Sequence, residues 1–236
     1  MTDVTKAAAE APRLRLLSAG KRASAIVLVL HGGAEQSSDR VRWWSGPYLR
    51  MLTFGLDALR AGSSHGVAVA LLRNRVRGWN EPALDPVRDA RWALEVIRRR
   101  RPSAPVVIVG HSMGGRVALH IADDPAVVGV AALAPWTPAE DGVESLRGVP
   151  ALIAHGLEDT ITKPADSLAY ARRAAAVTDV VRFELPGEAH SLLKRAAVWH
   201  RLVRSFTLHV LGLRPPGEPL RAALALPGEQ RLRVRV

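Results

Sequence analysis

Short apolar runs alternate along the chain with longer segments in which apolar residues recur every three or four positions. Runs that are apolar at nearly every position are typical of strands buried on both faces of a parallel sheet. These runs lie at residues 25–30, 67–72, 106–109, 128–133, 149–155 and 180–185. A further segment, 13–18, alternates between polar and apolar residues and predicts an edge strand.

Helical periodicity fills the segments between the apolar runs. In the first of them, leucines repeat at intervals of three and four from Leu49 to Leu59. The other helices are predicted at 86–101, 116–122, 165–176 and 192–210. Strands that alternate with helices at this spacing predict an α/β fold, with a mostly parallel sheet covered by helices on both faces.

The carboxyl ends of the predicted strands carry the polar residues of greatest interest. Active sites of parallel α/β folds gather beyond these ends, because the loops that follow the strands meet there. The residues that stand just past a predicted strand end are His31, Ser112, Trp136, Asp159 and His190. Their convergence predicts a functional site at this edge of the sheet.

One of these strand ends carries the pattern G-x-S-x-G. The run 106–109 leads into Gly110-His111-Ser112-Met113-Gly114, and a helical segment follows. A sharp turn from strand to helix strains the backbone and is tolerated only where the neighbouring residues are very small. The turn would leave the Ser112 hydroxyl exposed at the start of the helix, as a nucleophile requires. The alternative is a glycine turn with a purely structural role.

Between this strand and this helix, the motif resembles the nucleophile elbow of the α/β-hydrolase family. The strand 25–30 ends in His31-Gly32-Gly33-Ala34, which is a second point of resemblance. The resemblance implies an oxyanion hole made by the N–H of Met113 with that of Gly33 or, as second choice, Ala34. We expect His31 to fix its loop by a hydrogen bond rather than to act in catalysis.

The same resemblance implies the other two members of a catalytic triad. The strand 149–155 runs into a His-Gly-x-x-Asp pattern that ends at Asp159, which resembles the loop that carries the acidic member in many small α/β-hydrolases. His190 follows the last predicted strand, where the family has its catalytic histidine. The order Ser112, Asp159, His190 is that of the family. The alternatives for the acid are Glu140, Asp141 and Glu158.

Only about 15 residues separate the strand that ends near Leu133 from the one that begins near Val149. Families with a cap domain usually insert it there, so the resemblance implies a lidless fold like that of the small esterases and dienelactone-hydrolase-like proteins. Trp43, Trp44, Trp79 and Trp136 are candidate walls of an open substrate site. Packing in the core is the alternative for each tryptophan.

The function implied by the resemblance is that of a serine hydrolase, a carboxylic-ester hydrolase acting on an ester or thioester of a small molecule through an acyl-enzyme. An acyltransferase or perhydrolase could use the same triad, and a non-catalytic binding module could share the fold. No cofactor is implied, and the sequence contains no His-Glu-x-x-His or carboxylate cluster that would predict a metal site.

Composition and charge add little to this prediction. At 236 residues the chain has the size of one domain, expected at 13–211, after a flexible lead at 1–12 and before an extended, Pro-rich basic tail at 212–236. The net charge of +11 comes mainly from scattered arginines. Without a nucleic-acid-binding motif, a solvated basic face is expected, with an anionic partner as the alternative.

The sequence also indicates the cellular compartment in which the protein is expected. Cysteine is absent, which removes disulfides and is compatible with a reducing environment. The N-terminus lacks the apolar region of a signal peptide, and no apolar run approaches the roughly 20 residues of a membrane span. We therefore expect a cytoplasmic protein.

Overall fold

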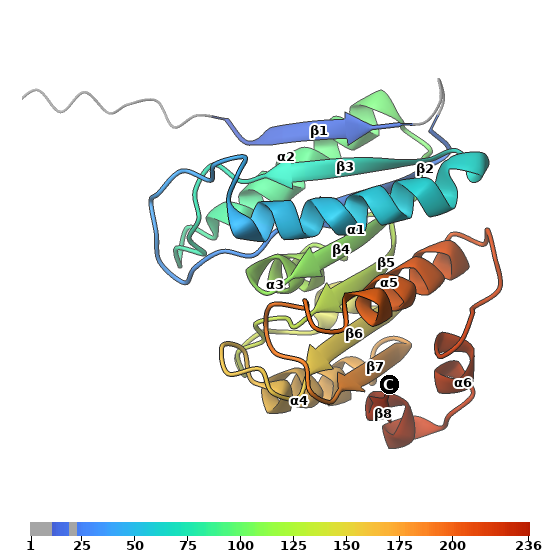
Figure 1. The fold of residues 1–236 in the computed structure, drawn as a ribbon. Helices are drawn as coiled ribbons and strands as arrows, with labels where there is room; N and C mark the ends of the chain where they lie inside the picture. The colour runs from blue at the N-terminus through green and yellow to red at the C-terminus, as the bar shows by residue number, and fades with distance from the viewer. Residues whose placement is uncertain (1–10, 19–22) are drawn as a thin grey trace, which may run out of the picture.

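Eight strands form one sheet in the computed structural model, which describes residues 11–18 and 23–236 (Figure 1). The strand order is β1-β3-β2-β4-β5-β6-β7-β8. Only β1 runs antiparallel, beside β3, and the other pairs are parallel. The strands are β1 (Arg13–Leu17), β2 (Ala25–Leu30), β3 (Val67–Arg73), β4 (Val106–His111), β5 (Val127–Leu133), β6 (Ala151–Gly156), β7 (Val180–Leu185) and β8 (Val234–Arg235).

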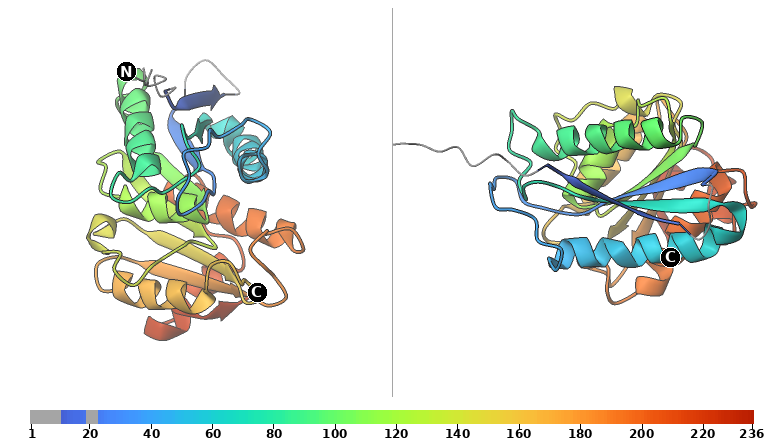
Figure 2. Two further views of the ribbon diagram at one scale, coloured as in Figure 1. Left: turned by 90° about the vertical axis from the view of Figure 1, so that its left-hand side faces the viewer. Right: turned by 90° about the horizontal axis from the view of Figure 1, so that it is seen from above.

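Helices cover both faces of the sheet, as the alternation of elements predicts. The helices α1, α5 and α6 lie on one face, and α2, α3 and α4 lie on the other (Figure 2). Their bounds are α1 (Gly46–Gly62), α2 (Asp85–Arg100), α3 (Met113–His120), α4 (Pro164–Ala174), α5 (Ala196–Val210) and α6 (Leu220–Leu224). Three 3-10 turns complete the description: η1 (Ser63–His65), η2 (Glu144–Leu146) and η3 (Gly228–Leu232). In the described part of the chain, every helix is too short or too polar to cross a bilayer.

The buried strands show why these runs are apolar at every position. Successive side chains of a strand point to opposite faces of the sheet. In β2, Ile26 and Leu28 pack with α2 and α3, whereas Val27 and Val29 pack with α1. A strand that contributes to two cores in this way needs apolar residues at odd and even positions alike.

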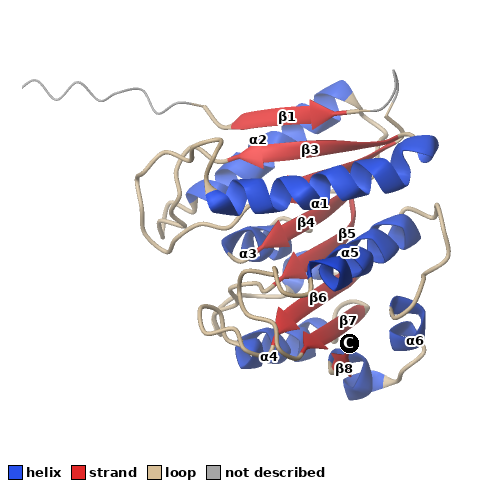
Figure 3. Ribbon diagram, in the orientation of Figure 1, coloured by secondary structure: helices blue, strands red, loops and turns tan. Residues whose placement is uncertain are grey.

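The loops that follow the parallel strands gather at one edge of the sheet, where the arrows end (Figure 3). The connection between β5 and β6 (residues 134–150) contains only the short turn η2. No cap domain covers this edge in the described chain, and the fold is the lidless α/β arrangement that the sequence predicts.

The final long helix differs from its prediction at its start. The periodic pattern places Leu192 on the helix, but α5 begins at Ala196. Leu192 has a φ of 60° and lies in the preceding loop, where its side chain is nevertheless buried against the sheet. Its apolar character therefore reflects burial and not helical structure.

The C-terminal segment also differs from the extended tail that its prolines predict. Leu220 and Ala223 of α6 are buried on the α5 side of the sheet, and Leu232 of η3 is buried on the other side. The segment then adds β8 beside β7. The first ten residues of the predicted lead lie outside the described residues.

Candidate active site

Ser112 occupies a strained turn between β4 and α3. Its φ of 58° and ψ of −122° belong to a region that residues with a side chain rarely adopt. The surrounding backbone is close enough to require glycine: a Cβ at Gly110 would lie 2.1 Å from the carbonyl oxygen of Gly114. A Cβ at Gly114 would lie 2.5 Å from the carbonyl oxygen of Leu30. The glycines of the motif thus allow the turn to form against the neighbouring strand β2.

Three side chains from separate loops form a continuous hydrogen-bonded chain. Ser112 Oγ lies 3.0 Å from His190 Nε2, and His190 Nδ1 lies 2.7 Å from Asp159 Oδ2. The Asp159 carboxylate is fully buried, whereas the His190 ring is partly exposed. In this arrangement the carboxylate selects the imidazole tautomer whose Nε2 accepts the hydrogen bond of the serine hydroxyl.

The loop after β6 holds the Asp159 carboxylate in place. Oδ1 accepts hydrogen bonds from the N–H groups of Ile161 and Thr162, at 2.8 and 3.0 Å. Oδ2 lies 3.0 Å from Thr162 Oγ1 and 3.3 Å from His155 Nε2. Burial acts to raise the pKa of Asp159, but the hydrogen bonds from these groups and from His190 outweigh it and hold the pKa far below its usual range. The carboxylate therefore stays ionised.

Three residues that support this chain were not singled out from the sequence: His111, His155 and Thr162. His111 Nε2 donates a hydrogen bond of 2.9 Å to the carbonyl oxygen of His190, and the two rings lie 4.7 Å apart. Thr162 Oγ1 also lies 3.1 Å from His190 Nδ1. The sequence feature that could have indicated the two histidines is their position, since His111 and His155 lie at or next to the ends of strands at the same edge of the sheet.

His31 fixes its loop, as predicted. Its Nδ1 donates to the carbonyl oxygen of Gly32 at 2.8 Å, and its Nε2 accepts a hydrogen bond from the N–H of Asn74 at 3.2 Å. The ring is buried, and this burial lowers the pKa of His31 to about 4. The neutral ring joins the loops that follow β2 and β3.

The candidate oxyanion donors differ in availability. In the described residues, no group accepts a hydrogen bond from the N–H of Gly33 or of Met113. The two residues are close, since a Cβ at Gly33 would lie 2.5 Å from Met113 Cε. The N–H of Ala34 donates to the carbonyl oxygen of Arg77 at 2.9 Å. The second choice, Ala34, is therefore wrong as a free donor, because its loop pairs with the loop after β3.

A cavity of about 250 Å³ opens at Ser112. Its volume is just below the usual range for ligand sites, roughly 300–1,000 Å³. Gly33, Met113, Trp136 and Thr162 are among the residues that line it. Of the four tryptophans predicted as walls, Trp136 is the one that reaches this cavity.

The other three tryptophans lie elsewhere, and Trp44 lines a separate, larger cavity. Trp79 is only 1% exposed and packs in the core. The guanidinium carbon of Arg116 lies 3.9 Å from the centroid of the Trp79 ring and 4.3 Å from that of Trp136. Trp43 is 63% exposed and packs edge-on against Trp44. The prediction that Trp79 and Trp43 line the site at Ser112 is therefore wrong: one ring is covered by Arg116, and the other lies on an outer loop.

In the described chain, none of the alternative acids hydrogen-bonds to His190, whose carboxylate partner is Asp159. Both carboxylate oxygens of Asp141 accept hydrogen bonds from Arg116, at 2.7 and 2.8 Å. Glu158 lies on the surface, with an oxygen 3.7 Å from Lys194 Nζ. Glu140 is exposed. Among the described residues, no group of three or more His, Asp or Glu side chains is arranged to hold a metal ion.

Comparison with known proteins agrees with the geometry. A family model described as the alpha/beta hydrolase family matches residues 26–234, from β2 into β8. The chain belongs to the alpha/beta hydrolase family. No curated protein matches the chain in sequence.

Solved structures of other hydrolases share the fold of this alpha/beta hydrolase at low sequence identity. Est1E from Butyrivibrio proteoclasticus, solved with bound ferulic acid, has a TM-score of 0.63 and 14% identity, and the match covers 85% of this chain and 96% of that one. A serine hydrolase without a lid from Xanthomonas campestris has a TM-score of 0.63 and 17% identity, over 88% and 91% of the chains. An esterase domain from Rhodothermus marinus has a TM-score of 0.56 and 19% identity, over 84% and 92%. At these identities the likeness is one of fold.

Proposed function

We propose that this alpha/beta hydrolase is a serine esterase that cleaves an ester or thioester bond of a small molecule. The observation that carries the proposal is the chain of hydrogen bonds from Ser112 Oγ through His190 to Asp159, at 3.0 and 2.7 Å. A serine hydroxyl is a weak nucleophile unless an adjacent base removes its proton. The strained turn presents this hydroxyl to the cavity, where a carbonyl carbon can approach it.

The reaction follows from these roles. His190 Nε2 takes the Ser112 proton while Oγ attacks the carbonyl carbon, and the negative charge that develops on the carbonyl oxygen is met by the N–H groups of Gly33 and Met113. The protonated His190 then gives its proton to the leaving alcohol or thiol as the carbon–oxygen or carbon–sulfur bond breaks. Asp159 stabilises the imidazolium without taking its proton.

Water completes the cycle by attacking the acyl-enzyme, with His190 again as the base. The lidless edge of the sheet supports hydrolysis over transfer to a second substrate, because nothing in the described chain covers the cavity at Ser112 and keeps water out. The small volume of this cavity, about 250 Å³, favours short acyl or alcohol groups.

Labelling with a fluorophosphonate probe tests the proposal. We expect a single adduct by intact mass on the unmodified protein and none on Ser112→Ala. The matched control is Ser103→Ala, at an exposed serine between α2 and β4, which should label like the unmodified protein. A p-nitrophenyl ester series of increasing acyl length should then show the highest kcat/KM for short chains. Absence of an adduct on the folded protein would overturn the proposal.

A further inference from the structure

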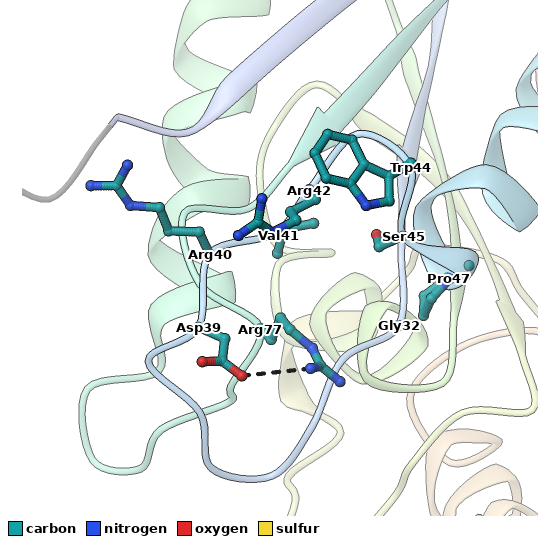
Figure 4. A pocket seen from close by; sticks show the side chains of 10 residues that line it. Gly32, Asp39, Arg40, Val41, Arg42, Trp44, Ser45, Pro47 and Arg77 are labelled. Atoms are coloured by element: carbon teal, nitrogen blue, oxygen red, sulfur yellow. Dashed lines mark ion pairs between the residues drawn. The ribbon is translucent and has the colours of Figure 1, made fainter.

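A second cavity, of about 480 Å³, adjoins the one at Ser112. It lies between the loop that joins β2 to α1 and the loop that follows β3 (Figure 4). The two cavities meet at consecutive residues, since Gly32 lines the larger one and Gly33 the smaller one. A Cβ at Gly32 would lie 3.3 Å from the Cβ of Ser112. The larger cavity therefore lies beside the turn that carries Ser112.

Positive charge dominates the lining of the larger cavity. Arg42 and Arg77 project from the two loops that form it (Figure 4). Arg77 has only a surface carboxylate nearby, with its Nη1 3.6 Å from Asp39 Oδ2 and both side chains more than half exposed. Such exposed pairs contribute little free energy and exchange readily with a competing anion. In the described chain, no carboxylate lies within ion-pair distance of Arg42.

Groups without charge complement the two arginines. Ser45 lines the cavity, and its hydroxyl oxygen is buried with no hydrogen-bond partner among the described residues. Ser45 also caps α1, whose first turn contains no acidic residue. The N-terminal end of a helix of this length carries partial positive charge. A buried hydroxyl without a partner is costly unless a ligand supplies one.

An aromatic surface borders the same charges. Trp44 lines the cavity and is half exposed, with its ring centroid 5.3 Å from the Arg42 guanidinium carbon. Stacking of this kind orients a guanidinium group and leaves its N–H edge free to bind an acceptor. A flat apolar face beside two cations suits a molecule that carries both an apolar portion and an anionic group.

We propose that the natural ester substrate carries a carboxylate or phosphate group, and that Arg42, Arg77 and Ser45 bind this anion while the ester carbonyl lies at Ser112. The inference rests on the proposed esterase function and specifies its substrate class. Guanidinium groups match the geometry of carboxylate and phosphate oxygens and form short, charge-assisted hydrogen bonds to them. The net charge of +11 also favours the approach of anionic substrates.

Matched pairs of esters test the proposal. Mono-p-nitrophenyl glutarate and p-nitrophenyl pentanoate have acyl chains of equal length and differ in a terminal carboxylate. For an anion on the leaving group, 4-acetoxybenzoate is compared with its methyl ester, and 4-acetoxyphenyl phosphate provides the phosphate. We expect the protein to prefer the charged member of at least one pair by kcat/KM.

The arginine variants identify the origin of this preference. Replacing both residues, Arg42→Gln and Arg77→Gln, should lower the charged-to-neutral ratio of kcat/KM by roughly tenfold or more. The neutral ester in each pair reports any general loss of activity. The control is Arg100→Gln, an exposed arginine at the last residue of α2, at the opposite end of the sheet. An equal ratio in the double variant and the unmodified protein would overturn the proposal.

A binding measurement separates this inference from the esterase proposal. Calorimetry with glutarate and with inorganic phosphate on the Ser112→Ala protein should show saturable binding that weakens as salt is raised and disappears in the Arg42 and Arg77 double variant. If fluorophosphonate does not label the protein, the esterase proposal fails, and the calorimetry still decides whether an anion site exists. Absence of binding, together with hydrolysis that does not distinguish charged from neutral esters, would overturn the anion site alone.

Discussion

Arg116 and Asp141 form a buried, bidentate ion pair, and Arg116 lies one turn along α3 from Ser112. Both side chains are almost inaccessible to solvent, and the guanidinium group is enclosed by the rings of Trp79 and Trp136. The hydrogen bonds and positive charge of Arg116, with His120 Nε2 at 3.2 Å, outweigh the effect of burial and lower the pKa of Asp141. The Asp141 carboxylate therefore neutralises Arg116 and holds it between the two tryptophan rings.

This relationship predicts different outcomes for the two aspartates. Asp141→Asn leaves the Arg116 charge buried without its partner and should lower the free energy of unfolding by about 3–5 kcal/mol. Asp159→Asn should instead lower kcat of the folded protein by up to about 10⁴-fold, since the His190 tautomer is no longer selected. Urea unfolding and p-nitrophenyl ester hydrolysis measure the two effects. Loss of activity in folded Asp141→Asn, with activity kept in Asp159→Asn, would make Asp141 the acid.

Gly33 offers a test of the oxyanion hole. In Gly33→Ala the new Cβ would lie 2.2 Å from the carbonyl oxygen of Arg77 and 2.6 Å from Met113 Sδ, so the loop must move and carry the Gly33 N–H with it. We expect kcat to fall by about 10²–10³-fold, as for loss of one oxyanion donor, with a smaller change in KM. Gly217→Ala is the matched control, because the atom nearest to a Cβ there, Ser205 Oγ, lies at an ordinary contact distance of 3.7 Å. Equal kcat values for the two variants would contradict the assignment.

The buried histidines predict how stability changes with pH. Burial lowers the pKa of His31 to about 4 and, together with the charge of His190, that of His111 to about 3. In the unfolded chain both rings bind a proton near pH 6.5, so the unfolded state takes up more protons as the pH falls. The stability contributed by the neutral rings is complete above pH 6.5 and is lost as the pH decreases toward 4.

Urea unfolding at pH 7 and pH 5 measures this loss. The free energy of unfolding should be lower at pH 5 by on the order of 4 kcal/mol, shared between the two rings. His111→Gln removes one titrating group and should reduce the difference by about half. His65→Gln, at the end of the 3-10 turn η1 that precedes β3, serves as the control and should leave this difference unchanged. Equal stability of the unmodified protein at the two pH values would contradict the prediction.

The C-terminal segment predicts a stability effect far from the site. Arg182 of β7 is buried and donates hydrogen bonds to Glu184 at 2.9 Å and to the carbonyl oxygen of Leu232 at 3.1 Å. Leu232 is 4% exposed, so Leu232→Ala should lower the free energy of unfolding by about 2–5 kcal/mol. Leu193→Ala, at a leucine that is 65% exposed, should change it by less than about 0.5 kcal/mol. Equal effects of the two changes would mean that the segment is detached in solution.

The resemblance to the α/β-hydrolase family implied Asp159 and His190, whereas local patterns in the chain were sufficient to predict the alternating α/β architecture, the sharp turn at Ser112 and the strand ends that carry polar residues. Each of these depends on neighbours in sequence: apolar runs for strands, glycines around a sharp turn, and polar residues at strand ends. The loop-fixing part of His31 could also be anticipated, since it directly follows β2.

Only the tertiary structure decided which side chains meet. The covering of Trp79 by Arg116, the pairing of Ala34 with Arg77 and the hydrogen bond from His111 to His190 join segments whose separation no periodicity encodes. The C-terminal segment is the clearest case, because its prolines predict an extended chain while the unpaired edge of β7 and the buried charges of Arg182 and Glu184 provide the partners that order it. Sequence determines local conformation through short-range sterics and amphipathicity, but contacts between distant loops depend on where the whole sheet places them.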